Sequence, residues 1–210
     1  MITTQAVADT FIDNTNPTVN FNGELLSVYI CPAQMKHYSI LKFDLSTIGR
    51  EQQIASARLK MFIQLRNTLT GNRSHEVHAI LNNWNESEAV WSNIIIDKPI
   101  ISTANTEIGK NFWVVWDVTW LVRKWVHQEF PNNGLAVVDE NIPKQEQEIR
   151  YGSRETVNPP QLEIYFGTET PTTEPSIPNT SIPEFTLPLM VCSVSIAMAF
   201  TIVSRRKRKE

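Results

Sequence analysis

The sequence predicts a mostly β protein, an antiparallel β-sandwich or jelly roll with one short helix, plus a C-terminal transmembrane helix. Two observations from residues 1–166 predict the sandwich: short apolar runs alternate with polar residues, and turn residues separate these runs. A third observation predicts the transmembrane helix, because an uncharged run closes the chain from residue 185 to residue 204.

The clearest predicted strand is SARLKMFIQLR, residues 56–66. Apolar residues at every second position alternate there with Arg58, Lys60 and Arg66. This period of two is typical of a strand with one face in a core and the other in water. The stretch HYSILKFDL repeats the pattern, with Tyr38 and Ile40 on the expected wet face. Further expected strands are LLSVYI, SHEVHAIL, NFWVVWDV, NGLAVVDE, EIRYGSRE and QLEIYFG.

One segment departs from this period and predicts the helix. Its apolar residues are spaced i, i+3, i+4, i+7 and i+8, which is the pattern of a short amphipathic helix. Asp117 or Thr119 can cap its first turn. The helix would close one end or one side of the sandwich. The apolar positions are Val118, Leu121, Val122, Trp125 and Val126.

The end of the chain predicts a surface anchor. Residues 167–184 are rich in Pro, Thr and Ser and predict an extended stalk without a core. Residues 185–204 would form a helix of roughly 30 Å, which matches the hydrocarbon core of a bilayer; the alternative is a buried globular helix. Residues 205–210 are basic and predict a cytoplasmic tail, which places the rest of the chain outside the cell.

The anchor resembles the archaeal PEF-type C-terminal sorting signal, with Pro183, Glu184 and Phe185 as the tripeptide before the span. The resemblance implies that an archaeosortase processes the tail and replaces the helix with a lipid anchor. The first residues, MITTQAVADTF, show neither the basic nor the apolar region of a signal peptide. We therefore expect a start further upstream, a piece of a longer surface protein, or export through the tail itself.

The charge of the chain limits the classes of partner it can bind, and its cysteines limit the disulfides it can form. Residues 1–166 contain 14 Lys and Arg against 18 Asp and Glu, which argues against nucleic acid as a partner. The two cysteines are Cys31, in the predicted domain, and Cys192, in the predicted span. No disulfide framework is expected from this pair.

Eight phrases in order resemble one family across residues 7–166, the DNRLRE-type domain. That domain is related to family 96 carbohydrate-binding modules and to the disaggregatase-related repeats of archaeal surface proteins. The resemblance implies a β-sandwich that binds polysaccharide or serves as a spacer, and it carries over no sugar-binding residue. The phrases are ADTFIDNTNPTVNF, LKFDLSTI, ASARLKMFI, WNESEAVW, WDVTWLVRKW, NNGLAVVDE, IRYGSRE and NPPQLEIYF.

Among the six tryptophans, Trp120 is the candidate for sugar contact. Its position on the helical wheel lies opposite the apolar stripe, so its ring is expected in solvent, unless a loop covers it or the helix begins later. Trp113 and Trp116 alternate in one expected strand, so at most one of them is exposed. The remaining tryptophans are expected to pack in the core or against a sheet.

Three basic residues of the long strand are candidates for contact with an acidic polysaccharide. The guanidinium groups of Arg58 and Arg66 can form bidentate hydrogen bonds with a carboxylate, and Lys60 adds charge between them. The alternative is a solvated sheet face whose charges protect the edge from aggregation.

The sequence requires no cofactor, but two loops rich in oxygen ligands, residues 12–20 and 137–143, could hold a structural calcium ion, although neither has EF-hand spacing. Catalytic signatures are missing from the sequence. His75 and His78 are three residues apart on an expected strand and point to opposite faces, unlike the helical pair of a zinc protease.

The sequence therefore predicts a non-catalytic polysaccharide-binding module at the cell surface, for attachment to wall or extracellular matrix. The alternative function is a structural spacer or adhesion module without a sugar site. A weaker alternative is a polysaccharide lyase or disaggregatase-like activity, which needs Tyr, His and Arg around a cleft.

Overall fold

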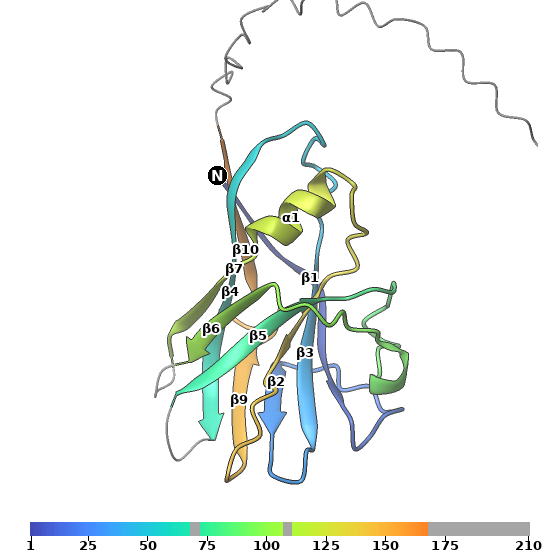
Figure 1. Cartoon of the computed structure of the whole chain (residues 1–210), viewed down its shortest axis with the longest axis vertical. Coiled ribbons are helices and arrows are strands. Elements are labelled where there is room, and N and C mark those ends of the chain that lie inside the picture. The colour runs from blue at the N-terminus through green and yellow to red at the C-terminus, as the bar shows by residue number, and fades with distance from the viewer. Residues whose placement is uncertain (68–71, 107–110, 168–210) are drawn as a thin grey trace, which may run out of the picture. The chain divides into compact units, whose positions relative to one another are not determined.

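The computed structural model describes residues 1–67, 72–106 and 111–167, all within the compact unit Met1–Thr170 (Figure 1). The predictions for the stalk from residue 168, the membrane helix, the basic tail and the Pro183-Glu184-Phe185 tripeptide lie outside the described residues. Within the described ranges, no helix is both long and apolar enough to cross a membrane.

Ten strands and two short helices form the described part, and every strand pair is antiparallel. The strands are β1 (Ile2–Asp13), β2 (Leu25–Ile30), β3 (Lys36–Phe43), β4 (Ile54–Asn67), β5 (Arg73–Ala79), β6 (Ser102–Thr106), β7 (Trp113–Asp117), β8 (Leu135–Val138), β9 (Gln147–Gly152) and β10 (Gln161–Phe166). The helices are α1 (Thr119–Val126) and a 3₁₀ turn, η1 (Trp91–Asn93). The prediction of a mostly β, antiparallel protein with one short α-helix is confirmed.

Six strands close into a ring, in the order β1, β10, β4, β9, β2, β3 and back to β1. Strands β8, β5 and β6 continue outward from β3, and β7 pairs with the other edge of β4. The two long strands make the closure possible. β1 pairs first with β10 and then with β3, and β4 pairs first with β10 and then with β9. The structure thus differs from two separate stacked sheets.

A register shift lies at each change of partner. In β1 it falls between Ala6 and Ala8, and in β4 between Ile63 and Leu65. Such irregularities bend a strand and increase its twist, which lets one strand serve two sheets.

The main core combines inward-facing residues of the ring strands with residues of β5, β7, β8 and α1, and it confirms the alternation predicted for β4. Leu59, Met61 and Ile63 are fully buried, whereas the residues between them point outward. Helix α1 packs its predicted apolar stripe against this core and lies beside β4 (Figure 1). Asp117 accepts a hydrogen bond at 2.9 Å from the backbone N–H of Thr119, the first helical residue.

A second apolar cluster covers the other face of β3, where the sequence predicts solvent. Tyr38 and Ile40 are buried there with Trp84 and Ala136, so the prediction of a wet face is wrong. The segment of residues 80–96 lies over this face and supplies Ile80, Trp84 and Ala89. Period-two alternation cannot reveal such a cover, because the covering residues come from a distant loop.

Candidate functional site

The outer face of the sheet formed by β10, β4 and β7 brings aromatic and charged side chains together. In register, Glu163, Arg58 and Asp117 form one row across the three strands. Gln161, Lys60 and Val115 form the next row, and Phe62 lies opposite Trp113. Tyr165 pairs with Ser56 near the beginning of β4. We call this surface the β4 face, defined by Arg58, Lys60, Phe62, Trp113, Val115, Asp117, Gln161, Glu163 and Tyr165.

The two predicted bases of the β4 face have different electrostatic surroundings. Lys60 Nζ lies 2.8 Å from Glu163 Oε1, and both side chains are mostly buried, so this ammonium is neutralised within the protein. Arg58 is exposed, and its guanidinium carbon lies 5.6 Å from the centroid of the Tyr165 ring. Hydrogen bonds from Thr119 lower the pKa of Asp117, and the charge of Arg58 adds to this effect. Arg58 is therefore the more accessible base for an anionic ligand.

Two half-buried aromatic rings mark the ends of the β4 face. Trp113 packs edge to face on Phe62 with ring centroids 5.3 Å apart, and Lys60 Nζ lies 5.1 Å from the Trp113 centroid. Trp116 is fully buried, which confirms that only one tryptophan of this strand reaches the surface. The partners of Tyr165 and Trp113 on β4 are six residues apart, or roughly 20 Å along the strand.

A groove of about 450 Å³ runs between β6 and β7 and adjoins the β4 face. Trp113 lines this groove and also belongs to the face, so it joins the two surfaces. Thr103 and Asn105 of β6 add a hydroxyl and an amide to the lining. The volume falls within the range of small-molecule sites, and polar groups beside an aromatic ring are the usual composition of a sugar site.

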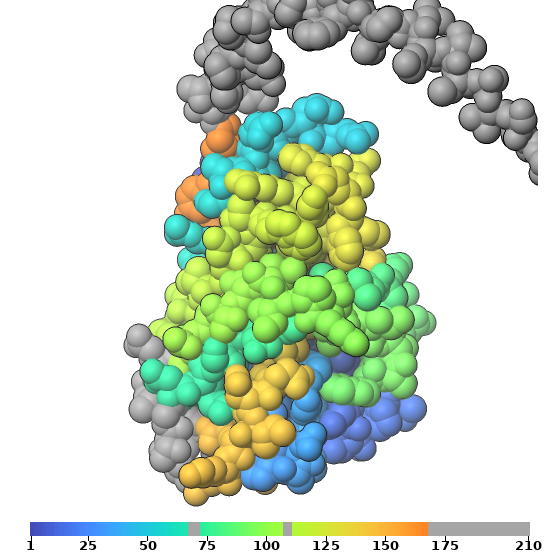
Figure 2. Space-filling model, in the orientation of Figure 1, coloured from blue at the N-terminus to red at the C-terminus, as the bar shows by residue number. Residues whose placement is uncertain are grey.

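The other two predicted residues lie elsewhere. Arg66 is on the part of β4 that pairs with β9, and its Nη1 donates a hydrogen bond of 3.2 Å to the carbonyl of Thr106. Trp120 is 56% exposed on α1, as its helical position predicts. Helix α1 lies on the upper part of the surface shown in Figure 2, in yellow-green. The structure therefore groups Arg58 with Lys60, adds Trp113 and Tyr165, and places Arg66 beyond the register shift.

The carboxylates of the two loops expected to hold calcium are bound by protein donors. Asp13 accepts hydrogen bonds from the backbone and hydroxyl of Thr15 and from Asn16, each at 2.7 Å. Asp139 lies 2.6 Å from the guanidinium of Arg73. A different group of acids, Asp9, Glu86 and Glu155, places one carboxylate oxygen from each residue within 4.8 Å of the others.

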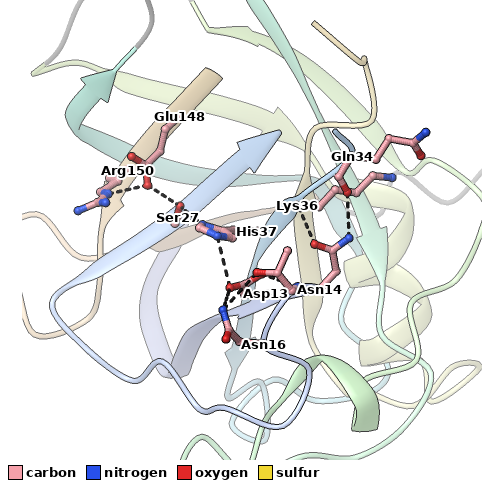
Figure 3. A network of polar contacts seen from close by, with 10 residues as sticks. Asp13, Asn14, Asn16, Ser27, Gln34, Lys36, His37, Glu148 and Arg150 are labelled. Atoms are coloured by element: carbon pink, nitrogen blue, oxygen red, sulfur yellow. Dashed lines mark hydrogen bonds and ion pairs between the residues drawn. The ribbon is translucent and has the colours of Figure 1, made fainter. Parts of the chain in front are cut away.

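A serine, a histidine and an aspartate follow one another in the polar network of Figure 3. Ser27 Oγ lies 3.0 Å from His37 Nδ1, and His37 Nε2 lies 3.7 Å from Asp13 Oδ2. Ser27 is only 2% exposed, and its hydroxyl donates to Glu148 Oε1 at 3.0 Å. A nucleophile needs both access to substrate and a base that takes its proton. This network instead links β1, β2, β3 and β9.

The model of carbohydrate-binding module family 96 matches residues 1–166. The chain therefore belongs to carbohydrate-binding module family 96, which confirms the relation to that family predicted from the sequence. A comparison with curated proteins gives no match.

Proposed function

We propose that this member of carbohydrate-binding module family 96 is a non-catalytic module that binds polysaccharide on the β4 face and in the adjoining groove. Family membership supports the ligand class. The observation that carries the location is the position of Trp113, which lines the groove and whose ring centroid lies 5.1 Å from Lys60 Nζ on the β4 face.

The chemistry of the face suits a pyranose chain. The apolar C–H faces of sugar rings stack on aromatic side chains, and Trp113 and Tyr165 offer two such rings. The hydroxyl and amide of Thr103 and Asn105 can exchange hydrogen bonds with sugar hydroxyls. Trp113, Tyr165, Thr103 and Asn105 are all on strands. Because strands hold their backbone in place before the sugar arrives, binding costs little conformational entropy.

Arg58 gives the face a preference for acidic sugars. Its guanidinium can bind a carboxylate or sulfate through two parallel hydrogen bonds. Because Glu163 already neutralises Lys60, most of the discrimination between acidic and neutral chains rests on Arg58.

Display at the cell surface is part of the same proposal. Residues 167–184 would act as the stalk and residues 185–204 as the membrane helix or sorting-signal helix, with the basic residues after it in the cytoplasm. An archaeosortase would process the tail near Glu184. The module would then attach its cell to wall or matrix polysaccharide. The intact mass of the tail in the native membrane tests processing: a full-length mass argues for a retained helix.

A lyase activity is the less favoured function. Tyr38 and His78 line a cavity of about 340 Å³, together with the carboxylates of Glu76 and Glu140. These carboxylates would repel a uronic acid. Burial and the hydrogen bond to Glu140 raise the pKa of Tyr38, which disfavours the tyrosinate that would act as a base.

Binding of the full chain in detergent to a panel of acidic and neutral polysaccharides tests the proposal. We expect saturable binding without depolymerisation. Trp113→Ala should weaken binding to every bound polysaccharide about tenfold, from the loss of one stacking contact of about 1.4 kcal/mol. Arg58→Ala should weaken binding to acidic chains more than to neutral ones. Trp120→Ala and Arg50→Ala are matched controls on other exposed positions, and Trp120→Ala also tests the sequence prediction.

The alternatives give different results. A folded protein that binds none of the polysaccharides would favour the spacer. Shortening of the polysaccharide would favour the lyase. Equal binding by Trp113→Ala and the wild type would remove the site from the β4 face.

A further inference from the structure

An acidic cluster outside the β4 face joins three distant segments of the chain. Asp9 comes from β1, Glu86 from the loop after β5, and Glu155 from the turn after β9. Arg154 is in this turn and not in a strand as the sequence predicts. Its backbone N–H donates to Asp9 Oδ2 at 2.8 Å. The cluster lies beside the register shift of β1, where that strand changes partner.

The two glutamates already receive protein donors on every carboxylate oxygen. Arg154 holds Glu86 through two hydrogen bonds of 3.0 and 2.7 Å, and the backbone N–H of Asp9 adds a third at 2.9 Å. Glu155 Oε1 lies 2.9 Å from Arg154, and its Oε2 accepts from Ser153 at 2.7 Å. These bonds fix both carboxylates in place beside Asp9.

Asp9 is the exception in this arrangement. Its side chain is fully buried, and its Oδ1 has no hydrogen-bond partner in the described part of the chain. Leaving a buried carboxylate oxygen without a partner is costly, and native proteins rarely do so unless something else satisfies the atom.

The charges of the cluster do not balance. Three carboxylates surround one guanidinium, which leaves two negative charges if all three are ionised. A proton on one carboxylate or a bound cation would offset this excess beside the unpartnered Oδ1 of Asp9.

We propose that Asp9, Glu86 and Glu155 bind a hard divalent cation, with calcium as the best fit. The three ligands offer only carboxylate oxygens, which suit calcium, magnesium or manganese and not the softer metals. Calcium tolerates an irregular set of ligands, whereas magnesium demands a near-ideal octahedron. Glu155 is exposed, so an ion has a path from solvent.

The cation would neutralise the excess charge and satisfy Asp9 Oδ1. It would also join β1 to the two loops, so its main effect is on stability. This inference does not depend on polysaccharide binding, and its failure would leave the β4 face untouched.

Thermal unfolding of the full chain in detergent tests the site, after treatment with a chelator and titration with calcium or magnesium. At a calcium concentration 100-fold above Kd, we expect Tm to rise by at least about 5 °C. Asp9→Asn and Glu155→Gln should abolish most of this rise. Glu88→Gln removes an equal charge from the loop of Glu86 but outside the cluster, and should respond like the wild type.

Several results would overturn the proposal. A wild-type Tm that neither ion changes would exclude the site, and an equal response of Asp9→Asn would move it elsewhere. A larger shift with magnesium than with calcium would overturn the choice of ion. If Asp9→Asn folds stably and neither it nor the wild type changes its Tm with calcium or magnesium, a proton shared among the carboxylates, and not a cation, satisfies Asp9. If Asp9→Asn does not fold, calorimetric titration of Glu155→Gln with calcium tests the site instead. We expect its calcium affinity to be at least tenfold weaker than that of the wild type, and an unchanged affinity would contradict the site.

Discussion

Replacing His75 with asparagine should remove a pH dependence of stability that one buried imidazole creates. His75 is almost completely buried, and its Nδ1 lies 2.8 Å from the hydroxyl of Tyr151. Burial raises the pKa of Tyr151, so the phenol beside Nδ1 keeps its proton and brings no negative charge to the imidazole. Burial, with the charges of Arg73 and Arg66, lowers the pKa of His75 to about 3. The native state therefore holds this imidazole neutral.

The sign of the effect follows from proton uptake by the unfolded chain. An unfolded histidine gains a proton below about pH 6.5, whereas native His75 stays neutral down to about pH 3. The free energy of unfolding thus falls as the pH drops through this window. Between pH 8 and pH 5, the expected loss is about 2 kcal/mol.

Urea unfolding at several pH values, compared between the wild type and His75→Asn, measures this contribution. The comparison is needed because the raised pKa of Asp9 acts in the opposite sense, losing stability as the pH rises towards 7. We expect the difference in unfolding free energy between the two proteins to shrink by about 2 kcal/mol from pH 8 to pH 5. His127→Asn, at a half-exposed position, is the control. A difference that stays constant with pH would refute a neutral, buried His75.

Two further substitutions test the packing of the fold. Trp116→Ala removes a fully buried ring and should lower the free energy of unfolding, measured in urea, by about 3–5 kcal/mol. Trp120→Ala, at an exposed position, should change it by less than about 0.5 kcal/mol. Equal losses for the two variants would contradict the burial described for Trp116. Gly134 has φ of +89°, and an added Cβ would lie 2.1 Å from the carbonyl oxygen of Leu41. Gly134→Ala should lower Tm and cost more than about 1 kcal/mol, while Gly49→Ala, which meets nothing within 4 Å, should be nearly neutral.

The sequence predicts the elements of the fold where one face is buried and the other is wet. The alternation of β4 and the helical spacing of α1 are of this kind, and both are confirmed. The prediction fails at β3, because a loop from residues 80–96 covers the expected wet face. The closure of the ring could not be predicted from the sequence either, because it depends on two strands that each change partner.

The candidate site was predictable only in part, for a related reason. Arg58 and Lys60 could be placed on one face from the alternation of a single strand. Trp113 and Tyr165 join them only because β7 and β10 pair with the same strand from far along the chain. No local feature of the sequence predicts those pairings. The burial of Asp9 could not be predicted for the same reason, because it arises from contacts with two distant loops.

The pairing of β10 has a mechanical consequence for an anchored module. If the chain is held beyond Phe166 and a polysaccharide pulls on the β4 face, the load passes from β4 to β10 within one sheet. The ladder from Gln161 to Phe166 runs antiparallel to β4, so the pull acts along the strands and across hydrogen bonds that lie perpendicular to them. These bonds must break together instead of one at a time. Load would thus travel from ligand to anchor through a ladder that is loaded in shear, whereas β5 and β8 lie outside this path.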